Sequence, residues 1–62
     1  GGGKMKAEKG DWISFYMDSA LIIDEVVFVR AASYASEDYY TMHNGKINNE
    51  YVFEVRKREE RK

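Results

Sequence analysis

The sequence predicts an all-β domain in which five short strands form a small barrel, with a 3-10 turn before the last strand. Residues 12–17 alternate between two sets of strand-forming side chains, which is the period of a strand with two different faces. The run 21–29 is rich in Val and Ile, which favour strands. Asn44-Gly45 is the strongest short-range hairpin signal, because a type I′ turn needs φ > 0 at both central residues.

The second strand is the least regular part of the pattern. A turn signal at 18–19 separates it from the first strand. Asp24 and Glu25 interrupt seven apolar residues in 21–29, and a straight strand would turn one of these carboxylates inward. We therefore expect one long bent strand or two successive strands, with the bend near Asp24. A helix over 20–35 is the alternative.

The remaining elements are short. They are expected in this order: a loop over 31–37, a strand over 38–43, the Asn-Gly turn at 44–45, a strand over 46–48 and a last strand over 53–57. Asn48 or Asn49 is expected to cap a single 3-10 turn that ends at Tyr51. The side chains assigned to the core are Ile13, Phe15, Met17, Ile23, Val27, Val29, Ile47, Val52 and Val55.

Composition limits the class of protein. The chain has 62 residues, no cysteine and a net charge of −1, so it predicts one small cytoplasmic domain without a disulfide. No stretch approaches the roughly 20 apolar residues of a membrane span, and we expect no secretory signal, because no charged segment followed by an apolar one occurs. We divide the chain into a disordered tail over 1–9, which begins with the tag-like Gly1–Gly3 and is expected to bury nothing, a barrel over 10–57 and a charged tail over 58–62.

One segment resembles a known family. The run Gly-Lys-Ile-Asn-Asn-Glu-Tyr-Val-Phe-Glu-Val at 45–55 resembles the closing segment of SH3-like and Tudor-like small barrels, and Gly-Asp-Trp-Ile at 10–13 resembles the first strand of bacterial members. The resemblance implies a five-stranded barrel of the bacterial or phage type that is used for binding. The proline expected at the position of Asn48 is absent, as is the mid-chain tryptophan of the proline-peptide groove. We therefore do not expect recognition of Pro-x-x-Pro ligands.

The sequence predicts no enzyme, cofactor or metal site. Asp24 and Glu25 are adjacent, so in a strand they face opposite sides and cannot act together on one bond; we interpret them as solvated acids at a bend. His43 is the only histidine and is expected to be an exposed turn residue. The serines have no histidine at a readable spacing, so a nucleophile–base pair is not indicated.

Aromatic side chains are the candidates for function. Nine of the 62 residues are aromatic, more than so small a core is expected to hide. We select Trp12, Tyr16, Tyr39 and Tyr51 as candidate binding residues; in the resembling family the ring at the place of Tyr51 lies on the ligand face. The plainer interpretation is that these rings only cover the ends of the barrel. The predicted function is a non-catalytic module that binds a protein partner through an aromatic patch or a strand edge.

Two other kinds of partner are retained. The basic run Arg56-Lys57-Arg58, continued by Arg61-Lys62, indicates nucleic-acid binding as the alternative function, with the same rings stacking on bases. The two carboxylates of Glu59-Glu60 reduce the net positive charge of this segment. The edge strands of an open barrel also predict a possible homodimer, because unpaired edges are natural pairing sites and a small domain gains stability from a second copy.

Overall fold

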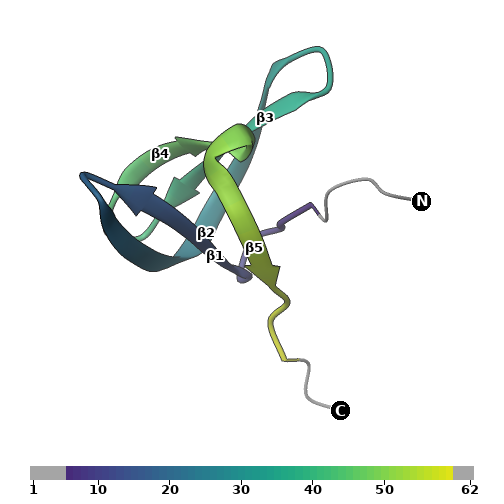
Figure 1. The fold of residues 1–62 in the computed structure, drawn as a ribbon. Helices are drawn as coiled ribbons and strands as arrows, with labels where there is room; N and C mark the ends of the chain where they lie inside the picture. Colours follow the sequence, from purple (N-terminus) through teal and green to yellow (C-terminus); the bar gives the residue numbers. More distant parts are fainter. Residues whose placement is uncertain (1–5, 60–62) are drawn as a thin grey trace.

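The computed structural model describes residues 6–59 and contains five antiparallel strands and one 3-10 turn in that range (Figure 1). The elements are β1 (Trp12–Met17), β2 (Ala20–Ser33), β3 (Ser36–Thr41), β4 (Gly45–Asn48), η1 (Asn49–Tyr51) and β5 (Val52–Arg56). The predicted all-β class and the 3-10 turn before the last strand are confirmed. The predicted Gly1–Gly3 tag and the end of the charged tail, 60–62, lie outside the described residues.

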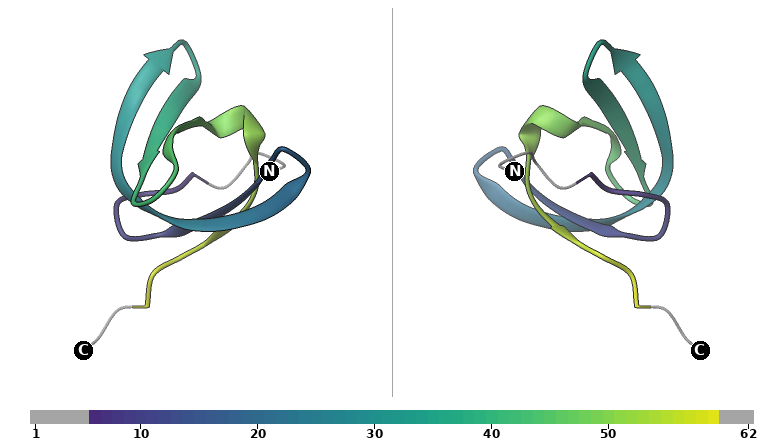
Figure 2. Two further views of the ribbon diagram at one scale, coloured as in Figure 1. Left: turned by 90° about the vertical axis from the view of Figure 1, so that its left-hand side faces the viewer. Right: turned by 90° about the vertical axis from the view of Figure 1, so that its right-hand side faces the viewer.

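The strands follow the order β4-β3-β2-β1-β5 in one curled sheet (Figure 2). Strand β2 is 14 residues long, and its first half pairs with β1 while its second half pairs with β3. The register with β3 shifts between Val26 and Phe28, just after Asp24-Glu25. The prediction of one long bent strand is therefore confirmed, and the alternative of a helix over 20–35 is wrong. Within residues 6–59, β4 and β5 are the two edges, and the sheet is not closed into a barrel.

Two loop predictions are wrong in detail. Residues 31–37 form no extended loop: Ala31 pairs with Glu37, and only Tyr34-Ala35 turn between β2 and β3. In this segment, strand pairing on either side of the β2–β3 turn outweighs the preference of small and polar residues for a loop. The turn at Asn44-Gly45 is not type I′, because Gly45 has φ 74° while Asn44 is not among the residues with positive φ. Thr41 pairs with Gly45, so the loop spans residues 42–44.

The type I′ signature occurs instead at the β1–β2 turn. Asp18 has φ 51° and Ser19 has φ 68°, which is the pair of left-handed residues that a tight two-residue hairpin requires. The third non-glycine residue with positive φ is Ala35, at 60°, in the β2–β3 turn. The tight first turn fixes the register of β1 and β2, in which the paired residues run from Met17 with Ala20 to Trp12 with Glu25.

The core lies inside the curl of the sheet. Its buried apolar members among the described residues are Ala7, Ile13, Phe15, Val26, Tyr39, Ile47 and Val52, with Ile22, Val29 and Val55 packed against them. Assignment of Met17, Ile23 and Val27 to the core is wrong, since all three are exposed. Ile23 is paired with Ser14 and therefore lies on the outer face of the sheet.

The amino-terminal segment joins the core. We predicted that residues 1–9 bury nothing, which is wrong at Ala7: this residue is buried, and its backbone N–H donates to the hydroxyl of Tyr39 over 3.2 Å. Gly10 and Asp11 then continue the chain beside β2, where Gly10 N donates to Val26 O and Val26 N donates to Asp11 O, both at 2.8 Å.

Candidate functional site

The outer face of β2, β1 and β5 carries most of the large exposed apolar side chains of the bent sheet. Pairing across these strands forms rows of neighbours on this face. Trp12 lies between Arg56 and Glu25, and Ser14 lies between Glu54 and Ile23. The next row contains Tyr16 beside Leu21. We define the outer face by its five large apolar members: Trp12, Tyr16, Leu21, Ile23 and Phe53.

A bulge in the β1–β5 pairing brings Phe53 to this face. The register shifts between Ser14 and Phe15, so that Phe53 is the extra residue on β5. Val52 and Val55 face the core side, whereas Phe53 and Glu54 between them are both exposed. The Phe53 ring stacks on Tyr16, with ring centroids 5.3 Å apart and planes 24° apart. The bulge therefore adds an aromatic residue that a regular strand would not place there.

The five side chains remain open to solvent. Each is between 42 and 64% exposed, and together they present on the order of 500 Å² of mostly apolar surface. Patches of this size on a small monomer often have a function, because contiguous apolar surface is unfavourable in water. Between Trp12 and Ile23 the face is hollowed by about 240 Å³, with Ser14, Glu54 and Arg56 completing the lining. The hollow has room for one apolar side chain of a partner.

Charges surround the hollow with both signs. Arg56 and Glu25 flank Trp12 on its two neighbouring strands, and Glu54 accepts a long hydrogen bond of 3.5 Å from the Ser14 hydroxyl. Ser14 itself is buried beneath its larger neighbours. An apolar centre with a polar rim is the usual anatomy of a protein-binding surface.

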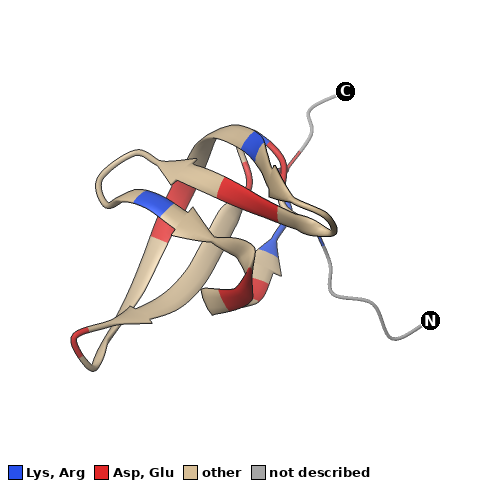
Figure 3. Cartoon of the chain, turned by 90° about the horizontal axis from the view of Figure 1, so that it is seen from above, with Lys and Arg blue, Asp and Glu red and all other residues tan. Residues whose placement is uncertain are grey.

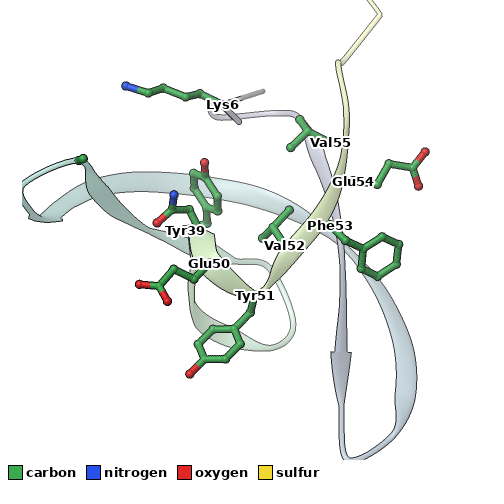
Figure 4. Close-up of a pocket in the computed structure, with 10 residues that line it drawn as sticks. Lys6, Tyr39, Glu50, Tyr51, Val52, Phe53, Glu54 and Val55 are labelled. Carbon is green, nitrogen blue, oxygen red and sulfur yellow. The ribbon is translucent and has the colours of Figure 1, made fainter. Parts of the chain in front are cut away.

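The four predicted rings are not one cluster. Trp12 and Tyr16 share the outer face, because side chains four residues apart on one regular strand lie on the same side of the sheet. Tyr39 is only 2% exposed, and its hydroxyl accepts from Ala7 N and donates to Glu37 Oε2 over 2.8 Å, so it belongs to the core and not to a surface. Burial, together with the Glu37 carboxylate, raises its pKa. Tyr51 is 70% exposed at the end of η1, beside a separate groove (Figure 4).

Sequence reasoning missed three members of the outer face: Leu21, Ile23 and Phe53. The alternation of Leu21 and Ile23 with Ile22 was a usable signal, because it places them on one face once β2 is known to be a strand. Phe53 had no such signal, since its orientation depends on a bulge set by the pairing with β1.

The basic run of the alternative function is partly engaged within the domain. The Lys57 ammonium donates to Asp11 Oδ2 at 2.8 Å, and Arg58 N donates to Asp11 Oδ1 at 2.9 Å. Burial raises the pKa of Asp11, but the hydrogen bonds from Lys57, Arg58 N and Glu8 N outweigh it and hold that pKa below its ordinary value. The hydrogen bond to the Asp11 carboxylate raises the pKa of Lys57. Lys and Arg positions and acidic positions are both distributed over the described chain (Figure 3).

The groups considered for catalysis have structural roles. His43 is exposed, as predicted, whereas Asp24 is buried and not solvated as we expected. Burial would raise the Asp24 pKa, but hydrogen bonds from Asn44 Nδ2, from the backbone N–H groups of Glu25 and His43, and from the His43 ring hold it below its ordinary value. Residues 6–59 hold no cluster of three His, Cys, Asp or Glu side chains suited to a metal ion.

Comparison of the chain with protein-family models, with curated proteins and with solved structures found no match. The part of the chain that the structure describes contains no helix long and apolar enough to cross a membrane.

Proposed function

We propose that this chain is a non-catalytic interaction module of the SH3-like small-barrel kind, which binds a protein partner through its outer face. The observation that carries the proposal is the set of five large apolar side chains left open on β1, β2 and β5 of so small a domain. The partner covers Tyr16 and Phe53 and inserts an apolar side chain beside Trp12. The strand order and the 3-10 turn before β5 support the small-barrel assignment.

The experiment compares proteins that co-purify with the tagged chain from its source cells. The variant Tyr16→Ser/Ile23→Ser removes two exposed anchors of the outer face. The matched control is Tyr34→Ser, because Tyr34 is fully exposed but lies in the β2–β3 turn. A partner should be recovered with the wild type and the control and lost with the double variant, while circular dichroism shows that all three chains fold. Equal recovery with all three would refute the proposal.

Nucleic acid is the competing ligand, and the same purification distinguishes it. The Lys57 ammonium is paired with Asp11, which reduces the basic charge available to phosphates. Nuclease treatment should leave the recovered partner unchanged. Recovery that disappears after nuclease, together with affinity for oligonucleotides that falls steeply with salt, would favour the alternative instead.

A further inference from the structure

A second surface, distinct in position from the centre of the outer face, runs along η1 and β5. It is a groove of about 990 Å³ lined by every residue from 49 to 55 and, from other segments, by Lys6, Ala35 and Tyr39 (Figure 4). Successive residues of a strand face opposite sides of its sheet. A groove that touches four successive residues of β5, from Val52 to Val55, therefore follows the edge of the strand and not one of its faces.

That edge carries main-chain groups without a strand partner. Among the described residues, β5 has β1 as its only strand neighbour; the Val52 N–H donates to Asn49 O of η1, and the backbone hydrogen bonds of turns and loops involve none of residues 53–56. In an antiparallel pair, alternate residues exchange hydrogen bonds with the neighbour, and the N–H and C=O groups of the others point to the opposite side. The groove runs along this unpaired side of β5, which makes the edge a template for a further strand.

The side chains of the groove add chemistry to this edge. Among the apolar residues that line the groove, Tyr39 and Val52 are buried and Val55 is half-buried, so the exposed apolar surface comes from Tyr51 and Phe53. The charged side chains along the groove are Glu50, Glu54 and Lys6, all exposed, so carboxylates outnumber ammonium groups and lie beside the strand itself. This arrangement favours a ligand with apolar side chains on one face and cationic ones on the other.

We propose that the groove binds an extended segment of a partner polypeptide, which adds to β5 as a further strand and directs Lys or Arg side chains toward Glu50 and Glu54. The five residues of β5 extend over about 17 Å, which matches a bound segment of similar length. A second copy of β5 fits less well: antiparallel pairing about the midpoint of the strand would place the two Glu54 carboxylates opposite each other, which is destabilising. The proposal does not rest on the function proposed for the outer face, although Phe53 and Glu54 border both surfaces.

The experiment titrates the full chain, labelled with ¹⁵N, with two blocked hexapeptides at low salt. One alternates Val with Lys and the other alternates Val with Glu. The Val-Lys peptide should shift the β5 amides and slow hydrogen exchange at those not paired with β1, and the Val-Glu peptide should bind at least about tenfold more weakly. N-methylation of alternate backbone nitrogens should abolish binding, because it removes the donors that a new strand needs.

Substitutions at exposed carboxylates test the charge preference. Glu50→Lys should reverse the order of the two peptides, and Glu50→Gln should give a smaller preference with no reversal. Glu25→Lys is the matched control, because Glu25 lies on the outer face and away from the groove; it should leave the order unchanged. The proposal is overturned by unshifted β5 amides at millimolar peptide, by equal binding of the N-methylated peptide, or by shifts confined to Trp12 and Ile23. It is also overturned if the β5 edge is already protected in the free chain and sedimentation depends on concentration, which would assign the groove to a second copy.

Discussion

Asp24 at the bend of β2 and Asn44 in the β3–β4 loop are joined by a hydrogen bond of 2.6 Å from the Asn44 amide to Asp24 Oδ2. The same carboxylate accepts the backbone N–H of Glu25 at 2.7 Å and of His43 at 2.9 Å, and it lies 3.2 Å from His43 Nδ1. Asp24 is almost fully buried. One carboxylate thus holds the bend of the long strand and the far hairpin loop in a fixed relation.

Replacing this carboxylate should destabilise the domain strongly. Asp24→Ala removes a buried carboxylate and leaves the backbone N–H groups of Glu25 and His43 and the Asn44 amide without their acceptor, so we expect a loss of about 3 kcal/mol in the free energy of unfolding. Urea unfolding followed by circular dichroism measures this. The neighbouring substitution Glu25→Ala should cost less than about 1 kcal/mol, because its side chain lies on the outer face. Similar losses for the two variants would contradict the assigned role of Asp24.

Stability should decrease in acid. The pKa values of Asp11 and Asp24 in the folded chain lie below the ordinary value of 3.8, so their ionised forms are favoured by folding. Their contribution is complete above that ordinary value and is lost as the pH falls through the folded-state pKa values. Urea midpoints at pH 7, 5 and 3 are therefore expected to differ little between the first two and to drop at the third. Asp24→Asn should reduce the drop, and an equal drop in this variant would exclude Asp24 as a source.

The same substitution at two alanines of one hairpin should have opposite effects. Ala35 has φ 60°, so Ala35→Gly removes the strain of a left-handed residue and should stabilise the chain by about 1 kcal/mol. Ala32 lies in β2, where Ala32→Gly should destabilise it by roughly 0.5–1 kcal/mol because glycine loses more backbone freedom. Thermal unfolding measures both effects: the melting temperature should rise for Ala35→Gly and fall for Ala32→Gly. A lower melting temperature for both variants would show that the β2–β3 turn is not strained at Ala35.

Replacing Asp11 should destabilise the domain more than replacing its ion-pair partner, Lys57. Asp11 is buried and accepts the backbone N–H groups of Glu8 and Arg58, at 2.8 and 2.9 Å, in addition to the Lys57 ammonium. Asp11→Ala should therefore cost about 2 kcal/mol, because two backbone donors lose their acceptor. Lys57→Ala removes an exposed charge, and its unfolding midpoint should stay close to that of the wild type. A larger effect at Lys57 than at Asp11 would mean that the ion pair, and not the backbone contacts, joins the two ends of the domain.

Local pattern predicted the elements of this fold better than their long-range contacts. The strand at 12–17 and the Asn48-capped turn are set by neighbouring residues, and the structure has both, with Asn48 Oδ1 accepting from Glu50 N at 3.1 Å. The Asn44-Gly45 turn was predicted wrongly because its geometry depends on Asp24, which lies 20 residues away in the chain. Burial of Ala7 depends in the same way on the hydroxyl of Tyr39, 32 residues away.

The candidate site shows the same limit. Trp12 and Tyr16 were predicted because alternation on one strand puts them on one face. Tyr39 was misplaced because its burial is decided by pairing with Val29 and Ile47 on the two neighbouring strands. Phe53 could not be predicted because a register shift across β1 and β5 turns it outward.

Site-specific photo-cross-linking tests the central claim most directly. A photoreactive phenylalanine analogue is placed at position 16 on the outer face or at position 34 in the β2–β3 turn, and each chain is irradiated in its source cells. The account predicts a discrete cross-linked protein at position 16 and none at position 34, where the side chain is more accessible but lies off the outer face. Cross-links to nucleic acid, equal cross-linking at both positions, or none at position 16 would contradict a protein-binding outer face.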